Sequence, residues 1–259
     1  MKKSSKTIIS LFSLLKQIQS QFLNWKKLKI LIPKFIEYHN QWKIYSIMEG
    51  AEPSEYTEFF PKIYDQTIST KFDSHYFYQD IWGFNRILES KCKHHVDIGS
   101  AVIFVGLLTA ITEVTFIDIR PLRVNLKNFK SKKGNILSLP YENNSISSLS
   151  SLHVAEHIGL GRYGDSLDPL GTKKAVKELS RILAPGGNLY FSLPIGKPKL
   201  CFNAHRIHST QQILEYFSDL KLLELSGVDD NANFLEHVDN NILDSCNYGC
   251  GFFWFTKKN

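Results

Sequence analysis

Three histidines stand beyond predicted strand ends, and each has the chemistry of a general base. An imidazole titrates near neutral pH, so it can take a proton from the hydroxyl group of a substrate that accepts a transferred group. His157 comes four residues after His153, a spacing that puts both on one face of a helical turn. Arg206 adjoins His205, and its cation would lower the pKa of that imidazole and attract an acidic or phosphorylated acceptor. The alternatives are packing or capping for His157 and a hydrogen-bonded loop position for His205.

A glycine-rich segment between these histidines predicts an acceptor-binding loop. Residues 159–165 read Gly-Leu-Gly-Arg-Tyr-Gly-Asp, so Arg162 and Asp165 lie in this loop and Asp168 follows it. Polar side chains of this kind bind sugar hydroxyls, and two acids near a histidine are also possible ligands of a hard metal ion. Between a metal site and a solvated loop, the sequence favours the solvated loop, so we expect no metal there.

A second group of residues predicts a cofactor site. Residues 97–101 (Asp-Ile-Gly-Ser-Ala) follow an apolar strand and precede a helix, and Gly99 lets the backbone turn close to a ligand. Asp118 ends the next strand, 21 residues after Asp97. An acid at that place can accept hydrogen bonds from both hydroxyls of a ribose.

The loop departs from the fingerprint of dinucleotide-binding proteins. That fingerprint needs glycines where this chain has Ala101 and Phe104, because a pyrophosphate must approach the backbone closely. A cofactor without phosphate does not impose this requirement. S-adenosylmethionine has none, so the sparser loop suits it.

The elements that position these residues alternate along the chain. Ser209 begins one helix with a capping box that Gln212 completes, and a helix from Tyr76 to about Ser90 has Ile81, Phe84 and Leu88 on one side. Such alternation predicts an α/β fold with a mostly parallel sheet that helices cover on both faces, and ligands at the carboxyl ends of its strands. Strands are expected at residues 95–98, 114–118, 146–152, 189–193, 221–225 and 251–255, and further helices at 102–110 and 173–183.

Four motifs, in this order, resemble those of the class I S-adenosylmethionine-dependent methyltransferases. Residues 96–100 (Val-Asp-Ile-Gly-Ser) resemble the first motif, and residues 116–118 (Phe-Ile-Asp) resemble the ribose-binding acid. Residues 135–141 (Asn-Ile-Leu-Ser-Leu-Pro-Tyr) resemble the segment that packs on adenine, with Asn for the usual Asp. Residues 183–191 (Leu-Ala-Pro-Gly-Gly-Asn-Leu-Tyr-Phe) resemble the turn before the fifth strand.

This resemblance implies a Rossmann-like fold with a seven-stranded, mostly parallel sheet. It also implies S-adenosyl-L-methionine as the cofactor, with the methionine part near the end of the fourth strand. The cofactor-binding residues that it implies are Asp97, Gly99, Ser100, Asp118, Asn135, Ile136 and His153.

Residues 152–165 and 202–206, with 78–82 upstream, are similar to one branch of that superfamily, the domain of unknown function 268. Members often stand beside surface-polysaccharide enzymes. The resemblance therefore implies methyl transfer to a sugar hydroxyl of a surface polysaccharide or its precursor, with a carbohydrate or lipid-linked sugar as acceptor. The residues expected to act are the catalytic His153, His157 and His205, and the acceptor-binding Arg162, Asp165, His205 and Arg206. Asp80 and Trp82 either close over the pocket or, for Trp82, pack in the core.

The bulk composition bounds the remaining possibilities. The chain has 259 residues and a formal net charge of +6, with the basic excess concentrated in the first 34 residues, so nucleic acid is not an expected partner. Leu11, Leu14, Leu15 and Ile18 repeat at helical spacing, which indicates either a helix packed on the main domain or a basic amphipathic helix on the inner face of a membrane. Four scattered cysteines indicate reduced thiols in a reducing compartment, the cytoplasm: Cys92, Cys201, Cys246 and Cys250.

The sequence thus predicts a helical extension and linker over residues 1–75 and a methyltransferase-like domain over residues 76–259. The alternative function is a non-catalytic module of the same fold that assists glycan assembly at the membrane. A nicotinamide enzyme is disfavoured by the missing glycines, and a glycosyltransferase by the lack of an Asp-x-Asp motif. The oligomeric state stays open.

Overall fold

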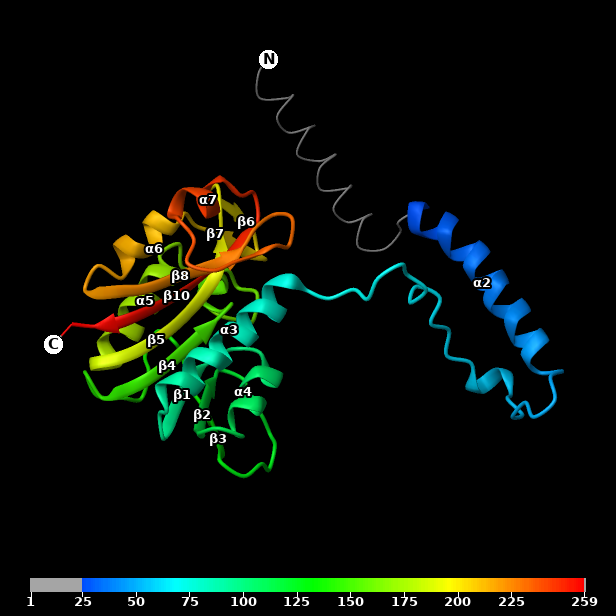
Figure 1. The fold of residues 1–259 in the computed structure, drawn as a ribbon, viewed down its shortest axis with the longest axis horizontal. Helices are drawn as coiled ribbons and strands as arrows, with labels where there is room; N and C mark the ends of the chain where they lie inside the picture. Colours follow the sequence, from blue (N-terminus) through cyan, green and yellow to red (C-terminus); the bar gives the residue numbers. More distant parts are fainter. Residues whose placement is uncertain (1–24, 259) are drawn as a thin grey trace, which may run out of the picture. The chain divides into compact units, whose positions relative to one another are not determined.

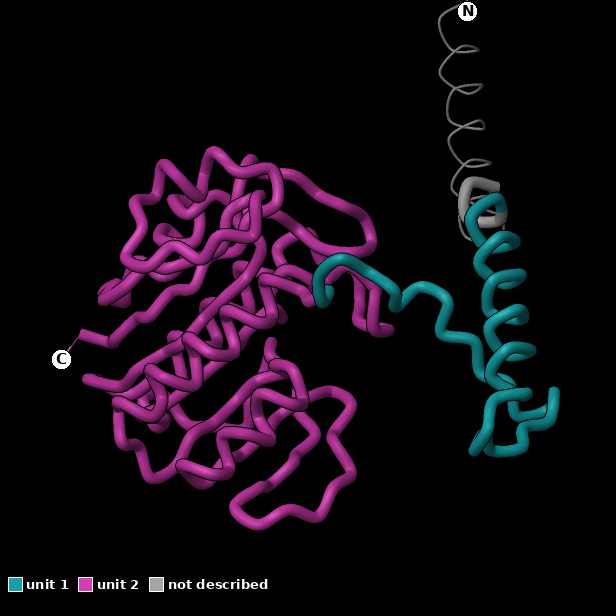
Figure 2. Tube along the Cα trace, turned by 45° about the vertical axis from the view of Figure 1, so that its right-hand side comes forward, with its two compact units in different colours: residues 1–71 teal, residues 72–259 magenta. Residues whose placement is uncertain are grey.

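The structure of the protein is a computed structural model that describes residues 25–258. The chain divides into two compact units, residues 1–71 and residues 72–259, which Figure 2 colours separately. The predicted helix around Leu11 to Ile18 lies outside the described residues. Among the helices that are described, none combines the length and the apolar character needed to cross a membrane.

The first unit is organised around one long helix, α2 (Trp25–Tyr45). The 3-10 turn η1 (Tyr56–Glu58) follows it, and the rings of Trp42, Tyr56 and Phe59 lie 4.9–5.0 Å apart between their centroids. Lys34 adds a hydrogen bond of 2.9 Å from its Nζ to the carbonyl of Ile63. An aromatic cluster therefore holds the segment after α2 against that helix.

The second unit is built on an eight-stranded sheet (Figure 1). Its strands lie in the order β3-β2-β1-β4-β5-β10-β8-β9. The first five strands in this order, from β3 through β1 to β5, run parallel to one another. Strand β10 is antiparallel to both β5 and β8. In chain order the strands of this sheet are β1 (His94–Ile98), β2 (Glu113–Asp118), β3 (Phe129–Lys133), β4 (Ile146–Leu152), β5 (Leu183–Ile195), β8 (Leu220–Val228), β9 (Phe234–Leu235) and β10 (Gly249–Lys257).

Helices cover both faces of this sheet. Helices α3 and α4 contribute Trp82, Ile87, Phe104 and Leu108 to one core, whereas α5, α6 and α7 contribute to the core on the other face. A two-stranded ribbon of β6 and β7 and the 3-10 turn η2 complete the unit. The bounds are α3 (Ser74–Ser90), α4 (Val102–Leu108), η2 (Ala155–His157), α5 (Gly171–Ile182), β6 (Lys199–Cys201), β7 (His205–Ile207), α6 (Thr210–Tyr216) and α7 (Asn240–Ser245).

The predicted α/β architecture with a mostly parallel sheet is confirmed, as is the capping box of Ser209 and Gln212. The sheet has one strand more than the seven expected, because the two-residue β9 pairs with the end of β8. Strand β5 starts directly where α5 ends, so the Pro-Gly-Gly turn lies within its first residues. The strand order places the ends of β1, β2 and β4 beside one another.

Of the three apolar residues that the sequence places on one side of α3, only Phe84 packs partly against the core. Ile81 and Leu88 are 47% and 49% exposed. The helix instead buries His75, Gln79, Trp82 and other residues one position away in the helical repeat, and these include polar side chains that apolar periodicity cannot identify. Polar residues of α3 therefore face the sheet.

One buried carboxylate ties α3 to β8. Glu224 accepts hydrogen bonds from Trp82 Nε1 at 2.8 Å, Arg86 Nε at 2.7 Å and Ser226 Oγ at 2.7 Å. Its side chain is 3% exposed. A buried charge is tolerated only when donors surround it, so these contacts fix the position of α3 over the sheet.

Glu224→Gln should lower the free energy of unfolding by about 1–3 kcal/mol, because the amide presents an N–H group to donors that need an acceptor. Urea unfolding followed by circular dichroism measures the loss. Glu236→Gln is the matched control, since Glu236 contacts the same Arg86 at 3.3 Å with a side chain that is 58% exposed. We expect the control to change stability by less than about 0.5 kcal/mol. Equal losses in the two variants would contradict a special role for the buried carboxylate.

Candidate active site

The loop after β1 is held by the buried carboxylate of Asp97. Asp97 Oδ1 accepts from the Ser100 amide at 3.0 Å, and Oδ2 accepts from the Ser100 hydroxyl at 2.6 Å and from the Ser150 hydroxyl. The Leu152 amide donates to Ser100 Oγ at 2.9 Å. Asp97 is fully buried, and this burial raises its pKa to about 6. Both predicted cofactor residues, Asp97 and Ser100, therefore shape the loop from beneath.

Gly99 and Asp118 form an open cradle at the ends of β1 and β2. Gly99 has a φ of +73°, and a Cβ added there would lie 3.2 Å from Val154 Cγ1 and 3.6 Å from Asp118 Oδ2. Asp118 Oδ1 accepts from the Arg120 amide at 2.6 Å, which leaves Oδ2 turned toward Gly99. The missing side chain at position 99 thus keeps a space open beside a carboxylate, where the sequence predicts a ribose.

The predicted adenine segment follows β3. Ile136 is buried in the core, whereas Asn135 is exposed and its Oδ1 accepts from the Leu137 amide at 2.9 Å. The side-chain carbonyl oxygen of Asn135 is therefore used in a local turn. The side-chain amide hydrogens of Asn135 remain the groups that it can offer to a ligand.

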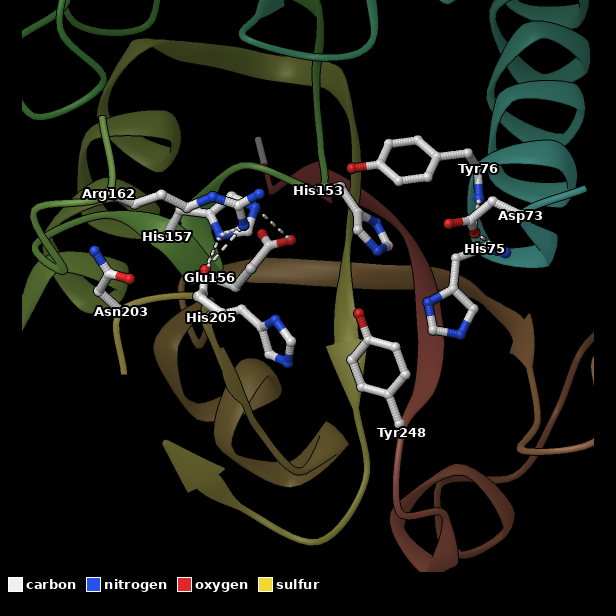
Figure 3. Close-up of a pocket in the computed structure, with 11 residues that line it drawn as sticks. Asp73, His75, Tyr76, His153, Glu156, His157, Arg162, Asn203, His205 and Tyr248 are labelled. Carbon is white, nitrogen blue, oxygen red and sulfur yellow. Dashed lines mark hydrogen bonds and ion pairs between the residues drawn. The ribbon is translucent and has the colours of Figure 1, made fainter. Parts of the chain in front are cut away.

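A cavity of about 500 Å³ lies beyond the end of β4 (Figure 3). Strand β4 and turn η2 supply His153, Glu156 and His157 to its wall, and all three are at most 9% exposed. The remaining wall comes from the start of α3, the loop after η2, the turn before β7 and the turn before β10. These other residues are Asp73, His75, Tyr76, Arg162, Asn203, Ala204, His205 and Tyr248.

Glu156 is the least expected group in this wall. Its side chain is completely buried and its carboxyl group points into the ring of labelled residues in Figure 3. Neither carboxyl oxygen has a hydrogen-bond partner, and the nearest basic atom is His157 Nε2, 3.5 Å from Oε1. Burial raises the pKa of Glu156 to about 8. A buried and unpartnered acid is costly, so its presence at a cavity wall indicates a functional group.

The histidine beside it is fixed in orientation. His157 Nδ1 lies 2.6 Å from the Ala204 carbonyl, which requires a proton on Nδ1 and leaves Nε2 facing Glu156 without one. Arg162 Nη1 donates to the same carbonyl at 3.0 Å. Burial, followed by the cation of Arg162, lowers the pKa of His157 to about 4. The imidazole is neutral at pH 7, with its basic nitrogen beside the carboxyl group.

His153 has an unusual backbone and a fully occupied Nδ1. Its φ of +56° lies in the left-handed region that side chains rarely adopt. Gln79 Oε1 accepts from His153 Nδ1 at 2.8 Å and from the Ser192 hydroxyl at 2.5 Å. Burial lowers the pKa of His153 well below its usual value, so the ring is neutral and its Nε2 is a free acceptor. Strain of this kind persists where the surroundings impose it, often at functional sites.

Two tyrosines frame the space between the histidines. The Tyr248 ring lies between His75 and His205, with centroid separations of 4.9 and 5.1 Å. The hydroxyls of Tyr76 and Tyr248 turn toward the middle of the cavity in Figure 3. Burial raises the pKa of each phenol to about 12, so both remain hydrogen-bond donors at neutral pH.

The structure brings together His153, His157, Arg162 and His205, four of the residues that the sequence predicts for catalysis or acceptor binding. His205 was expected to have its pKa lowered by Arg206. The pKa is lowered, but by burial first and then by the cations of Arg162 and Lys199.

Asp165 and Arg206 are not among the residues that line the cavity. Asp165 accepts from the Gly159 amide at 2.6 Å, and Arg206 donates to the carbonyls of Ile158 and Asp168 at 2.6 and 2.9 Å. Both side chains therefore hold the loop after η2. Asp168 pairs with Lys174 at 2.6 Å. Trp82 is core, 4% exposed, and Asp80 bonds Gln79, so neither closes over the cavity.

The cofactor cradle and the cavity are linked by the loop after η2. The guanidinium of Arg120 lies 4.5 Å from the centre of the Tyr163 ring. That ring meets His157 edge-on at 5.7 Å. Arg120 also bonds Asp118 through its amide, so one chain of contacts runs from Asp118 to the cavity.

The chain is similar to known proteins in part of its sequence and in its fold. The family described as "Caenorhabditis protein of unknown function, DUF268" matches residues 118–236. No curated protein matches the chain in sequence. The solved structures that resemble it do so at low identity, so the likeness is one of fold.

Three of these structures share the fold over most of their length. A complex of the Haloferax volcanii Trm112 methyltransferase activator and a putative methyltransferase contains a chain with 13% identity and a TM-score of 0.52, covering 71% of this chain and 90% of its own. The N-methyltransferase NodS from Bradyrhizobium japonicum WM9 has 14% identity and a TM-score of 0.50, with coverage of 71% and 96%. A putative sarcosine dimethylglycine methyltransferase from Galdieria sulphuraria has 13% identity and a TM-score of 0.50, with coverage of 70% and 86%.

These findings agree with the motifs around Gly99, Asp118 and the Pro-Gly-Gly turn, and with the order of the sheet strands. The resemblance inferred from the sequence is confirmed. The chain is therefore a protein with the class I methyltransferase fold whose residues 118–236 match the DUF268 family.

Proposed function

We propose that this protein transfers a methyl group from S-adenosylmethionine to a sugar hydroxyl of a surface polysaccharide or its precursor. The observation that carries the proposal is Glu156, a fully buried carboxyl group without a partner at the wall of a polar cavity. A hydroxyl acceptor must lose a proton as its oxygen attacks, so a hydroxyl methyltransferase needs such a group. The fold and the cradle support the cofactor.

The residues at the cradle fit an adenosine-type cofactor. A Cβ at Gly99 would fill the space between Val154 and Asp118, and Asp118 Oδ2 faces that space as an acceptor for ribose hydroxyls. The exposed side-chain amide of Asn135 can donate to the base. When bound, S-adenosylmethionine supplies an electrophilic methyl group on a positively charged sulfur. His153 lies between the cradle and the cavity, at the end of β4.

The chain's own residues can take the acceptor proton. The ionised form of Glu156 would take the hydroxyl proton of the acceptor on Oε1 or Oε2 as the acceptor oxygen receives the methyl group. His157 Nε2 lies 3.5 Å from Oε1 and stays unprotonated beside the carboxyl group, because the His157 proton is on Nδ1 and is donated to the Ala204 carbonyl. The buried setting strengthens these interactions and holds the acceptor close to the methyl group.

The wall of the cavity favours a sugar over an apolar acceptor. Its donors are Arg162, Asn203 and the two phenols, and its neutral imidazoles accept as well as donate. The Tyr76 and Tyr248 rings offer flat apolar surfaces beside these polar groups. A cavity of about 500 Å³ is within the usual size for small-molecule sites.

Asp118→Ala should abolish S-adenosylmethionine binding that isothermal titration calorimetry detects for the unaltered protein, because the variant removes the ribose acceptor. Glu113→Ala is the matched control: Glu113 begins the same strand that Asp118 ends, and its side chain is exposed. We expect the control to bind normally. Undiminished binding by Asp118→Ala would refute the ribose assignment. No binding by the unaltered protein at millimolar cofactor would favour the non-catalytic module.

Glu156→Gln should lower the rate of transfer from methyl-labelled S-adenosylmethionine to a panel of nucleoside diphosphate sugars by about 10²–10⁴-fold, with cofactor affinity unchanged. In the unaltered protein the rate should rise with pH up to about 8, where Glu156 becomes ionised. If His157 were the base, the rate would be level above about pH 5, because the His157 pKa is about 4. The titratable or charged groups that share the cavity wall with Glu156, and so act on its ionisation, include His157, Arg162, His153, His205, Tyr76 and Tyr248.

The protonation of Glu156 can be tested without an acceptor. Its pKa rises from 4.5 to about 8 on folding, so the folded state binds the proton more tightly and stability falls as pH rises between these values. Glu156→Gln lacks this proton. Its stability relative to the unaltered protein should therefore increase through that window, by up to about 1.4 kcal/mol per pH unit, and then level off. Chemical unfolding from pH 5 to 9 measures the difference, with the exposed Glu142→Gln as control; a flat difference would show that Glu156 is not held protonated.

A further inference from the structure

Three metal-ligand side chains converge at the inner end of the cavity. His75 lies in the first turn of α3, His153 follows β4, and Cys250 lies near the start of β10. One nitrogen of each histidine and the Cys250 sulfur lie within 4.8 Å of one another. All three residues are buried, at 8%, 9% and 0% exposure. The proposed methyl transfer assigns none of these three side chains to proton transfer.

We propose that His75, His153 and Cys250 bind a zinc ion. Two imidazoles and one thiolate are typical zinc ligands, with Zn–N and Zn–S bonds of about 2.0–2.3 Å. A tetrahedral site with these bonds needs ligand atoms ~3.5 Å apart, so the longest separation has to shorten by roughly 1 Å. His153 Nε2 and Cys250 Sγ are already 4.0 Å apart.

The surroundings of His153 prepare its Nε2 as a ligand. Gln79 Nε2 donates to Asp80 at 3.2 Å, which turns Gln79 Oε1 toward His153 Nδ1. His153 Nδ1 therefore carries the ring proton and donates it in a hydrogen bond to Gln79 Oε1, and Nε2 keeps its lone pair. Metal-bound histidines commonly donate their second nitrogen to an oxygen acceptor in this way, which fixes the ring and its tautomer.

Cys250 can supply the anionic ligand. Its sulfur lies 3.4 Å from the Leu193 carbonyl and carries a proton in the absence of a metal, because burial raises the thiol pKa well above 9. Zinc displaces that proton to solvent and binds the thiolate. Three protein ligands leave the fourth position open, as in catalytic zinc sites.

The open position faces the cavity, because His75 and His153 both line it. A hydroxyl oxygen bound there would lose its proton more easily. This role rests on the proposed function, since it assigns the zinc to the acceptor hydroxyl, whereas the zinc site itself does not depend on it. The sequence favours unligated thiols, because Cys250 is paired with no nearby ligand along the chain.

The test is metal binding by the full chain. The protein is stripped with a chelator and titrated with Zn²⁺, and with Co²⁺ as a spectroscopic probe. We expect one equivalent of either metal to bind, and the Co²⁺ form to show thiolate-to-cobalt charge-transfer absorption and intense visible bands of tetrahedral cobalt. Cys250→Ser should lose the charge-transfer band, and His75→Ala should bind Zn²⁺ at least tenfold more weakly. Cys246→Ser is the control. It changes another buried cysteine, at the end of α7, and should match the unaltered protein.

His75→Ala keeps the test decisive if Cys250→Ser does not fold, and circular dichroism monitors both. No stoichiometric metal binding, a charge-transfer band that survives Cys250→Ser, or a loss of the band in Cys246→Ser would each overturn the zinc site. Calorimetry with S-adenosylmethionine on the same samples separates this result from the proposed function. Binding of the cofactor without binding of metal would refute only the zinc site. Binding of metal without binding of the cofactor would refute only the proposed methyl transfer.

Discussion

The buried carboxylate of Asp97 is the constraint on which the arrangement of the site depends. It lies between two parallel strands with no access to water, where an unpaired charge would be very costly. The Ser100 amide and hydroxyl and the Ser150 hydroxyl satisfy it, and these donors belong to the loop after β1 and to β4. Because the Leu152 amide is tied to Ser100 as well, the ends of β1 and β4 are held in one register. The positions of Gly99 and His153 follow from that register.

The two halves of the site are assembled differently. The cradle comes from consecutive strand–turn units, so Gly99, Asp118 and Asn135 follow one another along the chain. The cavity takes its wall from segments that are far apart, from Asp73 to Tyr248. Motifs that are close together along the chain suit a cofactor that many proteins of one fold share. Segments that are far apart along the chain can change in sequence independently of one another. Specificity for an acceptor is therefore expected to reside in the second set.

Much of the fold could be predicted because its signals are local. Apolar runs, the Ser209 capping box and the Pro-Gly-Gly turn identify the strands and helices directly. The buried face of α3 could not be predicted, because Gln79 and His75 are polar and their burial depends on partners in other strands. The same reason hid Glu156, which stands in a recognised motif yet looks like an ordinary surface acid until the cavity encloses it. Arg206 and Asp165 bond to nearby backbone groups, and residue type alone does not indicate such contacts of the folded loop.

The position of β10 has a consequence for the order in which the protein folds. This strand follows both β5 and β8 in the chain, yet it lies between them in the sheet, so both are synthesised before it. Until it inserts, β5 and β8 each present an unpaired backbone edge, the kind of surface on which chains aggregate. Cys250 and the adjacent Tyr248 arrive with it. Sheet closure and completion of the cavity wall are thus one event, whereas the strand ends that carry Gly99 and Asp118 belong to β1 and β2, which pair without β10.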